Sequence, residues 1–365
     1  MHATGNPTRR RVVGALAGAA LAATLARARA SASEITRTNP PEPKPALPAD
    51  YGDPVELDTP DGTLAGSLLR PEAVAPAPAD ARVMNAALTA SARPPLVVIV
   101  AGSGPTDRDG NSRAGLRTDA YRQLAAGLAR AGIASLRYDK RGVGQSLNAV
   151  RDPAALSVDG YAADLARWLD AMRDTHRFGR CVIAGHSEGA LLATLAARHE
   201  SVDGVALLCG TGRRVGALLR DQLAPRLDAA ARADLDRALA QLEAGRPLDR
   251  PPASLGAVGA SVLAPSVQPL LMSWMRHDPA ADLARLDTRV LIVHGSTDTQ
   301  LRPADRAALL DARPDATVRL IDGMCHTLKH AEMDGASQAR AYVDATLPVM
   351  PELVASVARF ARGTA

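Results

Sequence analysis

Aromatic residues are scarce in this chain: only 2% of its 365 residues are Phe, Trp or Tyr. Lysine is also scarce, with three residues, so arginine carries nearly all of the positive charge. The formal net charge is +4, but residues 1–32 contain five Arg and no acidic residue, which leaves the rest of the chain at −1. Proteins bind nucleic acids by neutralising phosphates with basic side chains and by stacking bases on aromatic rings. Because this chain has few aromatic residues and no excess of positive charge beyond residue 32, we do not expect it to bind nucleic acid.

Cysteine is rare as well: Cys181, Cys209 and Cys325 are too few for a disulfide framework and odd in number. Cys209 and Cys325 each follow a predicted strand at the same sheet edge. A disulfide between them in an oxidising compartment is one interpretation, and free thiols are the other. The apolar run at residues 12–25 is shorter than the ~20 residues that span a bilayer, and no other run is long enough, so we expect no stable membrane insertion of the mature protein.

The first 32 residues have the order of a secretory signal peptide. Three Arg at positions 9–11 precede the apolar run, and the small residues Ala30, Ser31 and Ala32 follow it. We expect residues 1–32 to be a signal peptide and the protein to be exported, periplasmic or secreted; an uncleaved anchor is the alternative. The arginines fit export by the twin-arginine pathway as well as by the general secretory pathway. Five Pro between positions 40 and 48 predict a stiff linker over residues 33–50.

From residue 95 onward, short apolar runs alternate with amphipathic stretches of helical period. The runs comprise residues 96–100, 134–138, 181–184, 204–208, 290–293 and 317–321. Such continuous runs are typical of parallel strands that helices cover on both faces. We therefore predict an α/β fold with a core built from residues 51–210 and 286–365. Residues 54–57 and 64–69 flank a Pro-Asp-Gly turn, which predicts a hairpin at the start of this core.

Residues 211–285 interrupt the alternation. They contain no strand pattern, and leucines between positions 218 and 242 recur at helical spacing. We expect a helical cap inserted into the core, with an independent second domain as the alternative. The Ala- and Pro-rich residues 71–94 predict a separate surface insertion.

A Gly-His-Ser-Glu-Gly segment at residues 185–189 carries the first chemical signal. It directly follows the predicted strand at 181–184 and precedes an apolar stretch of helical character. In a G-x-S-x-G motif between a strand and a helix, the serine lies on a sharp turn at the helix N-terminus, where partial positive charge favours a developing anion. Ser187 is therefore the candidate nucleophile.

A serine nucleophile needs a base, and the base needs an acid that orients it. Asp298 follows the predicted strand at 290–293, and His326 follows the one at 317–321, so both fall at the sheet edge that carries Ser187. The order Ser, Asp, His along the chain is that of α/β-hydrolases. His330 and Asp322 remain as alternatives for the base and the acid.

The negative charge that develops on a substrate oxygen needs two backbone N–H donors. One is expected from Glu188, the residue after the nucleophile. The other is expected from the Gly-rich loop at residues 101–105, which follows the first central strand, with Ser103 as the candidate.

Three segments together resemble the bacterial α/β-hydrolase serine esterases: residues 102–111 (GSGPTDRDGN), residues 137–146 (RYDKRGVGQS) and the 185–189 motif. Carboxylesterases with a G-S-G-P-x-D-R-D motif in the oxyanion loop are the most similar. The resemblance implies an α/β-hydrolase fold, with the catalytic triad and oxyanion amides at the candidate residues above. It also implies ester hydrolysis without a cofactor or metal, and a structural role for residues 139–146 in bracing the oxyanion loop. Residues 107–109 either line the substrate site or form a self-contained turn network.

The leading hypothesis is an exported serine hydrolase that cleaves small-molecule carboxylic esters through an acyl-enzyme intermediate. A serine peptidase, aminopeptidase or amidase with the same triad is the alternative, because related capped hydrolases remove N-terminal residues and hold the amine with acidic side chains of the cap. The cap does contain acidic residues: Asp221, Asp228, Asp234, Asp236 and Glu243. A binding protein with an inactive hydrolase fold is the hypothesis from a different class.

Overall fold

The computed structural model describes residues 51–71 and 93–364. The predicted signal peptide at residues 1–32, the predicted linker at residues 33–50 and most of the predicted insertion at residues 71–94 lie outside the described residues. Among the helices that are described, none is long and apolar enough to cross a membrane.

In the described part of the chain, eight strands form one mostly parallel sheet in the order β1-β2-β4-β3-β5-β6-β7-β8. The strands are β1 (Asp53–Thr59), β2 (Gly62–Leu69), β3 (Leu96–Val100), β4 (Ala134–Tyr138), β5 (Cys181–His186), β6 (Gly204–Leu208), β7 (Val290–Gly295) and β8 (Thr317–Ile321). β2 pairs antiparallel with β1 and β4, and the remaining pairs are parallel. The predicted α/β fold is confirmed, and the hairpin at its start pairs Thr59 with Gly62.

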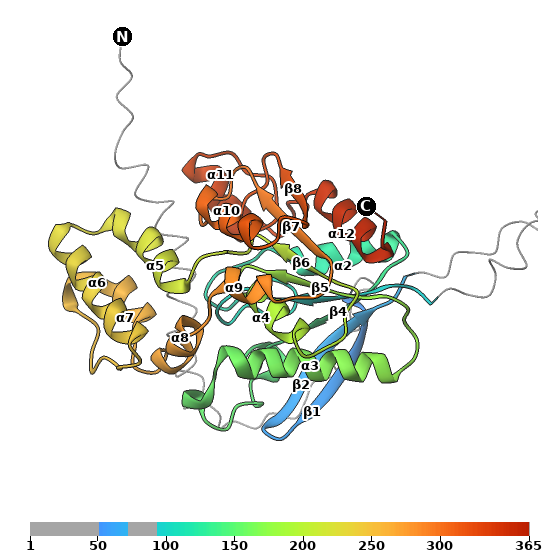
Figure 1. Cartoon of the computed structure of the whole chain (residues 1–365), viewed down its shortest axis with the longest axis horizontal. Coiled ribbons are helices and arrows are strands. Elements are labelled where there is room, and N and C mark those ends of the chain that lie inside the picture. The colour runs from blue at the N-terminus through green and yellow to red at the C-terminus, as the bar shows by residue number, and fades with distance from the viewer. Residues whose placement is uncertain (1–50, 72–92, 365) are drawn as a thin grey trace, which may run out of the picture.

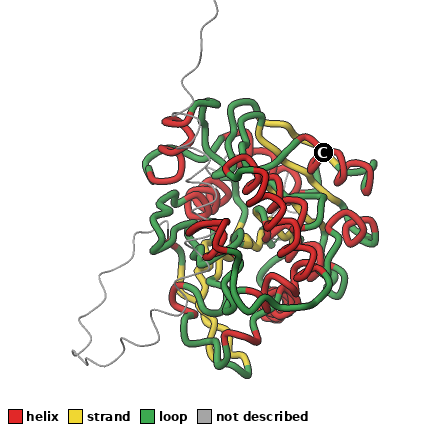
Figure 2. Tube along the Cα trace, turned by 90° about the vertical axis from the view of Figure 1, so that its left-hand side faces the viewer, coloured by secondary structure: helices red, strands yellow, loops and turns green. Residues whose placement is uncertain are grey.

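The side chains of the strands alternate between two hydrophobic layers. Val98 and Val100 of β3 lie in the layer formed with α3 (Val158–Asp174) and α4 (Glu188–Ala197). Val97 and Ile99 lie in the layer formed with α2 (Ala120–Arg130) and α12 (Pro351–Arg362). Successive strand residues point to opposite faces, so a wholly apolar run marks a strand that is covered on both sides. Figure 1 shows α3 on one side of the parallel strands and α12 on the other, while the β1–β2 hairpin projects at the lower edge. In Figure 2 the central strands lie among helices.

The segment between β6 and β7 contains helices and no strand. Its elements are α5 (Val215–Leu223), η6 (Ala224–Arg226), α6 (Ala229–Glu243), η7 (Ala253–Leu255), α7 (Gly256–Val262), α8 (Gln268–Met275) and α9 (Pro279–Ala284), where η denotes a 3₁₀ helix. Helices α5 to α8 gather at one end of the molecule, away from α12 (Figure 1). Leu219, Leu235 and Leu239 are buried in the same layer as α3 and α4, which joins this segment to the core.

The helical periodicity between residues 218 and 242 is interrupted in the structure. Helix α5 ends at Leu223, and Pro225, which has no N–H to donate, lies in the following 3₁₀ turn. Helix α6 begins afresh where the Asp228 carboxylate accepts a hydrogen bond of 2.8 Å from the Ala231 N–H. The leucine spacing did not reveal this break, because leucines on both sides of it are buried.

The remaining elements are η4 (Gly144–Ser146), η5 (Pro153–Ala155), α10 (Pro303–Ala312) and α11 (Gly335–Val343). Strands β5, β7 and β8 are parallel, so their carboxyl ends reach the same edge of the sheet. The turns and loops that follow these strands carry Ser187, Asp298 and His326 to that edge, which is where open α/β sheets form their sites.

Candidate active site

Ser187 lies alone in the turn between a strand and a helix. Strand β5 ends at His186 and α4 begins at Glu188, so one residue makes the whole turn, with φ 56° and ψ −118°. A positive φ is uncommon for a residue with a Cβ and costs of order 1–3 kcal/mol. The Ser187 N–H donates to the Leu208 carbonyl at 2.9 Å, and the Ser187 carbonyl accepts from the Ala190 N–H at 3.0 Å. These bonds hold the side chain at the N-terminus of α4.

Two glycines let the neighbouring backbones approach this turn. A Cβ on Gly189 would lie 2.4 Å from the Val100 carbonyl oxygen, which is far inside van der Waals contact. A Cβ on Gly102 would lie 3.2 Å from the Ser187 Cβ, so the loop after β3 passes directly against the serine. Close packing therefore requires glycine at position 189 and leaves little room for a side chain at position 102.

The structure brings Ser187, His326 and Asp298 into one hydrogen-bonded chain. His326 Nε2 lies 3.1 Å from Ser187 Oγ, and His326 Nδ1 lies 2.8 Å from Asp298 Oδ2. A carboxylate only accepts, so the imidazole proton belongs on Nδ1, and Nε2 is left to accept the serine proton. This is the arrangement that a base needs in order to activate a serine hydroxyl.

The Asp298 carboxylate is buried but remains in its charged form. Burial alone would raise its pKa, yet the His326 imidazole and the Gln300 N–H, which donates to Oδ1 at 2.8 Å, bring the pKa of Asp298 below its ordinary value. The side chains of His326 and Asp298 are only 6% and 4% exposed. In such a site, an ionised carboxylate can stabilise the imidazolium that forms when Ser187 loses its proton.

The two predicted oxyanion amides border the serine. Within residues 51–71 and 93–364, neither the Ser103 N–H nor the Glu188 N–H donates a hydrogen bond to another protein group. Glu188 is the first residue of α4, and Ser103 follows Gly102, the residue that packs against Ser187. Both amides are thus available to a substrate oxygen at the N-terminus of α4.

His186 links the loop of Ser103 to the loop of His326. His186 Nε2 lies 2.7 Å from the His326 carbonyl oxygen, which can only accept, so this nitrogen carries the proton. His186 Nδ1 then accepts from the Tyr121 hydroxyl at 2.8 Å, and the same hydroxyl accepts from the Gly102 N–H at 3.0 Å. Burial, reinforced by the nearby His326, lowers the pKa of His186 to about 3, so it is neutral. Tyr121 lies outside every motif of the sequence, so only the structure reveals its part in this chain of hydrogen bonds.

Comparison with known proteins identifies the family. Residues 112–333, well over half of the chain, match the sequence profile of the serine aminopeptidase S33 family. The chain belongs to this family. Its fold is the α/β-hydrolase fold, as the resemblance of the sequence to bacterial serine esterases implied.

Individual relatives are distant. Esterase EstD of Thermotoga maritima is 25% identical over 290 residues, which are 78% of this chain and 63% of that esterase. This chain therefore spans less than two thirds of the length of EstD. The structure of Est1E from Butyrivibrio proteoclasticus gives a TM-score of 0.52 at 15% identity, covering 85% of this chain and 99% of Est1E. Est1E with bound ferulic acid gives 0.50 at 16% identity, covering 83% and 99%.

The alternative base and acid do not reach the serine. Asp322 is exposed and accepts a hydrogen bond of 2.8 Å from Ser296 Oγ. The side chain of His330 is 61% exposed and lies 3.7 Å from Glu332. In the described residues, no hydrogen bond or ion pair joins either of them to Ser187. The three cysteines are free thiols, so the structure contains no bond between Cys209 and Cys325.

The charged residues of the G-S-G-P-T-D-R-D segment form a turn network. The Asp107 carboxylate accepts from the N–H groups of Asp109 and Asn111 at 3.0 and 2.8 Å, and burial raises its pKa to about 6. The Arg108 N–H donates to Asp139 Oδ1 at 2.8 Å, and Asp139 Oδ2 accepts from the Gln145 N–H at 2.8 Å. Asp139 thus ties the oxyanion loop to the segment after β4, in the bracing role that the resemblance implied.

One group of side chains has the composition of a metal site. The donor atoms of His186, Cys209 and His326 lie within 4.8 Å of one another. However, the nitrogens of His186 are used by Tyr121 and the His326 carbonyl, and those of His326 by Ser187 and Asp298. A metal ion would have to break these hydrogen bonds, so the residues do not fit a resident metal.

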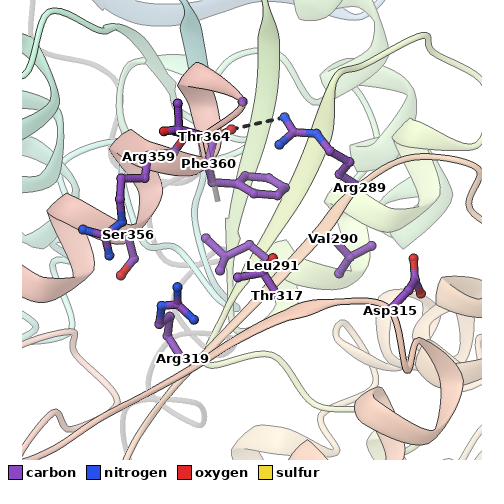
Figure 3. Close-up of a pocket in the computed structure, with 11 residues that line it drawn as sticks. Arg289, Val290, Leu291, Asp315, Thr317, Arg319, Ser356, Arg359, Phe360 and Thr364 are labelled. Carbon is purple, nitrogen blue, oxygen red and sulfur yellow. Dashed lines mark hydrogen bonds between the residues drawn. The ribbon is translucent and has the colours of Figure 1, made fainter.

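A separate cavity of about 260 Å³ lies at the opposite end of the sheet (Figure 3). It is lined by residues of the amino-terminal halves of β7 and β8, by the segments that precede them and by the last two turns of α12, among them Arg289, Arg319, Arg359 and Phe360. Arg289 donates to the Phe360 carbonyl at 3.2 Å, and its guanidinium lies over the Phe360 ring. No candidate catalytic residue lines this cavity.

Proposed function

We propose that this protein is a serine hydrolase that cleaves carboxylic esters. The observation that carries the proposal is the Ser187–His326–Asp298 chain, with contacts of 3.1 and 2.8 Å, built on a one-residue turn at the N-terminus of α4. The family and the distant relationship to EstD support the same reaction class.

The geometry supports a reaction in two halves. Ser187 Oγ attacks the ester carbonyl carbon while His326 Nε2 takes the hydroxyl proton, and Asp298 stabilises the imidazolium. The carbonyl oxygen becomes an oxyanion, which accepts hydrogen bonds from the Ser103 and Glu188 N–H groups. His326 then protonates the leaving alcohol. In the second half, His326 takes a proton from a water molecule that attacks the acyl carbon. His326 then returns this proton to Ser187 Oγ as the bond between the serine and the acyl group breaks, which releases the acid and restores the serine hydroxyl.

An aminopeptidase is the second candidate, because the family description names that activity. Such an enzyme needs an acidic side chain free to hold the substrate amine. Six of the eight acidic residues in the 211–285 segment form ion pairs with arginines: Asp221, Asp234, Asp236, Glu243, Asp278 and Asp282. Asp228 caps α6, and the exposed Asp249 has no ion pair among the described residues. Most of these charges are therefore already compensated, which favours an ester over an N-terminal peptide.

The test compares p-nitrophenyl esters, from acetate to long acyl chains, with aminoacyl p-nitroanilides on the full chain and on Ser187→Ala. We expect ester turnover that the variant loses by several thousand-fold or more. Labelling of Ser187 by a fluorophosphonate, which needs only a competent nucleophile, is the companion measurement. Turnover of the anilides alone would favour the peptidase hypothesis over the esterase hypothesis. The absence of both turnover and labelling would favour a binding protein with an inactive hydrolase fold.

We also propose that the protein is exported and that residues 1–32 are removed. The support is the order of charged, apolar and small residues in the sequence. Fractionation of cells that express the full chain, with N-terminal sequencing of the product, tests this. An exported product that starts near residue 33 is expected, and a cytoplasmic product that retains residue 1 would contradict it. Replacing Arg9 and Arg10 with Lys tests the export route: loss of export would indicate the twin-arginine route, and unchanged export would indicate the general one.

A further inference from the structure

A buried lysine lies beside the candidate oxyanion hole. Lys140 follows β4 by two residues and is only 2% exposed. Lysine is rarely buried, because removing an ammonium group from water is costly unless a partner compensates for the lost hydration. The contacts of Lys140 therefore indicate what the buried charge is used for.

The Lys140 ammonium contacts two groups of the candidate site. Its Nζ donates to the Gly102 carbonyl oxygen at 2.7 Å and lies 3.6 Å from Glu188 Oε1. Glu188 is 4% exposed, and its Oε1 has no hydrogen-bond partner among the described residues, so the ammonium is the group that compensates this carboxylate. The ring of Tyr161 lies 5.2 Å from Nζ and completes the enclosure.

The geometry of the peptide bond connects this contact to the oxyanion hole. The Gly102 carbonyl and the Ser103 N–H belong to the same peptide unit, and in a planar trans peptide they point in opposite directions. A group that holds the carbonyl oxygen on one side therefore sets the direction of the N–H on the other. The preceding Gly102 N–H is held as well, by the Tyr121 hydroxyl at 3.0 Å. Gly102 is thus anchored on both sides while it packs against Ser187.

We propose that Lys140 is a positioning residue for the oxyanion hole, and that Glu188 holds it in place. The ammonium orients the Gly102–Ser103 peptide and draws electron density toward the Gly102 carbonyl, which makes the Ser103 N–H a stronger donor. Glu188 contributes its backbone N–H as the second donor and its carboxylate as the partner of the ammonium. One buried ion pair therefore joins the two amides that receive the oxyanion. This inference rests on the proposed function.

The ammonium acts on the transition state more than on the bound substrate. An oxyanion carries nearly a full negative charge, whereas a ground-state ester carbonyl carries a small partial charge. A better oriented and more polarised N–H therefore stabilises the tetrahedral state preferentially, and this effect is strong where water is excluded. The proposal predicts a loss in kcat with little change in KM.

The test is Lys140→Met, which keeps the length of the side chain and removes the ammonium. We expect kcat to fall about 10- to 100-fold, less than the 10²- to 10³-fold loss seen when an oxyanion donor itself is removed. Affinity for a trifluoromethyl ketone with the same acyl chain should fall by a similar factor, because its hemiketal oxygen occupies the oxyanion hole. The pH at which activity is half-maximal should stay the same, because the contact between His326 and Asp298 is untouched.

Arg313→Met is the matched control. Arg313 is a buried cation that donates to two backbone carbonyls, of Leu286 and Thr288, at 3.1 and 2.9 Å, at the amino end of β7. Its removal should lower the melting temperature but leave kcat and the affinity for the ketone within about twofold of wild type, since it lies outside the proposed site.

A double variant covers the case in which Lys140→Met fails to fold because Glu188 is left buried without a partner. Lys140→Met/Glu188→Met removes both charges and keeps both backbone amides, and apolar replacement of a whole buried ion pair is often neutral for stability. We expect this protein to fold and to show the same loss in kcat and ketone affinity. A folded double variant with wild-type values for both would overturn the proposal, as would a loss in kcat with unchanged ketone affinity. If Ser187→Ala itself kept full turnover, the proposed function would fail instead.

Discussion

The two ends of the parallel sheet are built differently. At the carboxyl end, Ser187 and Cys209 adopt positive φ angles of 56° and 48°, and Lys140 and Glu188 are buried. At the amino end, the segments before β7 and β8 carry arginines, and Arg289 bonds to backbone carbonyls beside an open cavity. Backbone strain and buried charge both oppose folding. The amino end has both as well, in His176 with φ 52° and in the buried Arg313, but Arg313 is satisfied by the Leu286 and Thr288 carbonyls, whereas the strain and buried charge of the carboxyl end lie at the candidate site. The contrast indicates that the carboxyl end is shaped for chemistry and the amino end for stability.

The largest expected effect is on activity at the carboxyl end. Asp298→Asn should lower kcat about 10⁴-fold, because the amide N–H favours the wrong imidazole tautomer and cannot stabilise an imidazolium. The unfolding free energy should change much less than the activation free energy. Steady-state hydrolysis of a p-nitrophenyl ester and urea unfolding measure the two quantities. A loss in kcat of less than tenfold would mean that Asp298 does not orient the base.

The next effect concerns packing behind the same turn. Gly189→Ala places a Cβ 2.4 Å from the Val100 carbonyl oxygen, so either α4 or β3 must move. We expect the unfolding free energy to fall by about 3 kcal/mol or more, measured by urea denaturation. Gly115→Ala is a suitable comparison, because a Cβ there meets no atom within 4 Å, although its φ of 108° adds backbone strain of its own. Gly189 has no positive φ of its own, so equal losses in the two variants would show that the close approach of β3 costs no more than the backbone strain at Gly115.

A pH-dependent effect follows from His186. Its pKa is about 3 in the folded protein and ~6.5 when unfolded, so between these values the unfolded chain binds the extra proton and stability falls as the pH falls. From pH 7 to pH 5 the loss is about 2 kcal/mol by linkage. Asp107, with a pKa raised to about 6 by burial, acts with the opposite sign, because its folded form binds the extra proton.

The contribution of His186 is therefore measured as the difference in pH-dependent stability between the wild-type protein and a His186 variant. His186→Gln can still donate to the His326 carbonyl but does not titrate, so its unfolding free energy should fall less than that of wild type between pH 7 and pH 5. Urea unfolding at both pH values gives the two slopes. Identical slopes would show that His186 is protonated in the folded protein as readily as in the unfolded chain.

The smallest expected effect is at the amino end. Arg289→Ala removes hydrogen bonds of 3.2 Å to the carbonyls of Asp203 and Phe360 and the contact with the Phe360 ring. The unfolding free energy should fall by about 1 kcal/mol, while kcat and KM stay within twofold of wild type. A large loss of activity in this variant would contradict the conclusion that the amino end of the sheet serves stability and not chemistry.

Local features of the sequence were enough to predict the sheet. The runs at 96–100, 134–138, 204–208 and 317–321 match four strands to the residue. In β3 the reason is that a strand covered on both faces needs a short, wholly apolar run, whereas β4 and β8 each contain an arginine and β8 is partly exposed at the edge of the sheet. The Gly-His-Ser-Glu-Gly motif likewise predicted the turn that carries the serine, because a one-residue turn between a strand and a helix needs glycines where backbones approach closely. The break at Pro225 was missed because leucines on either side of it hide the interruption.

The sequence by itself determined the α/β alternation, the serine on its turn, and a short set of candidate acids and bases that follow strands. Only the tertiary structure distinguished His326 from His330 and Asp298 from Asp322, and it alone revealed the contact of Lys140 with the peptide next to Ser187. The reason is physical. Strand and turn preferences depend on neighbouring residues, whereas contacts between loops 38 residues apart (Gly102 and Lys140) or 139 apart (Ser187 and His326) depend on strand order and register.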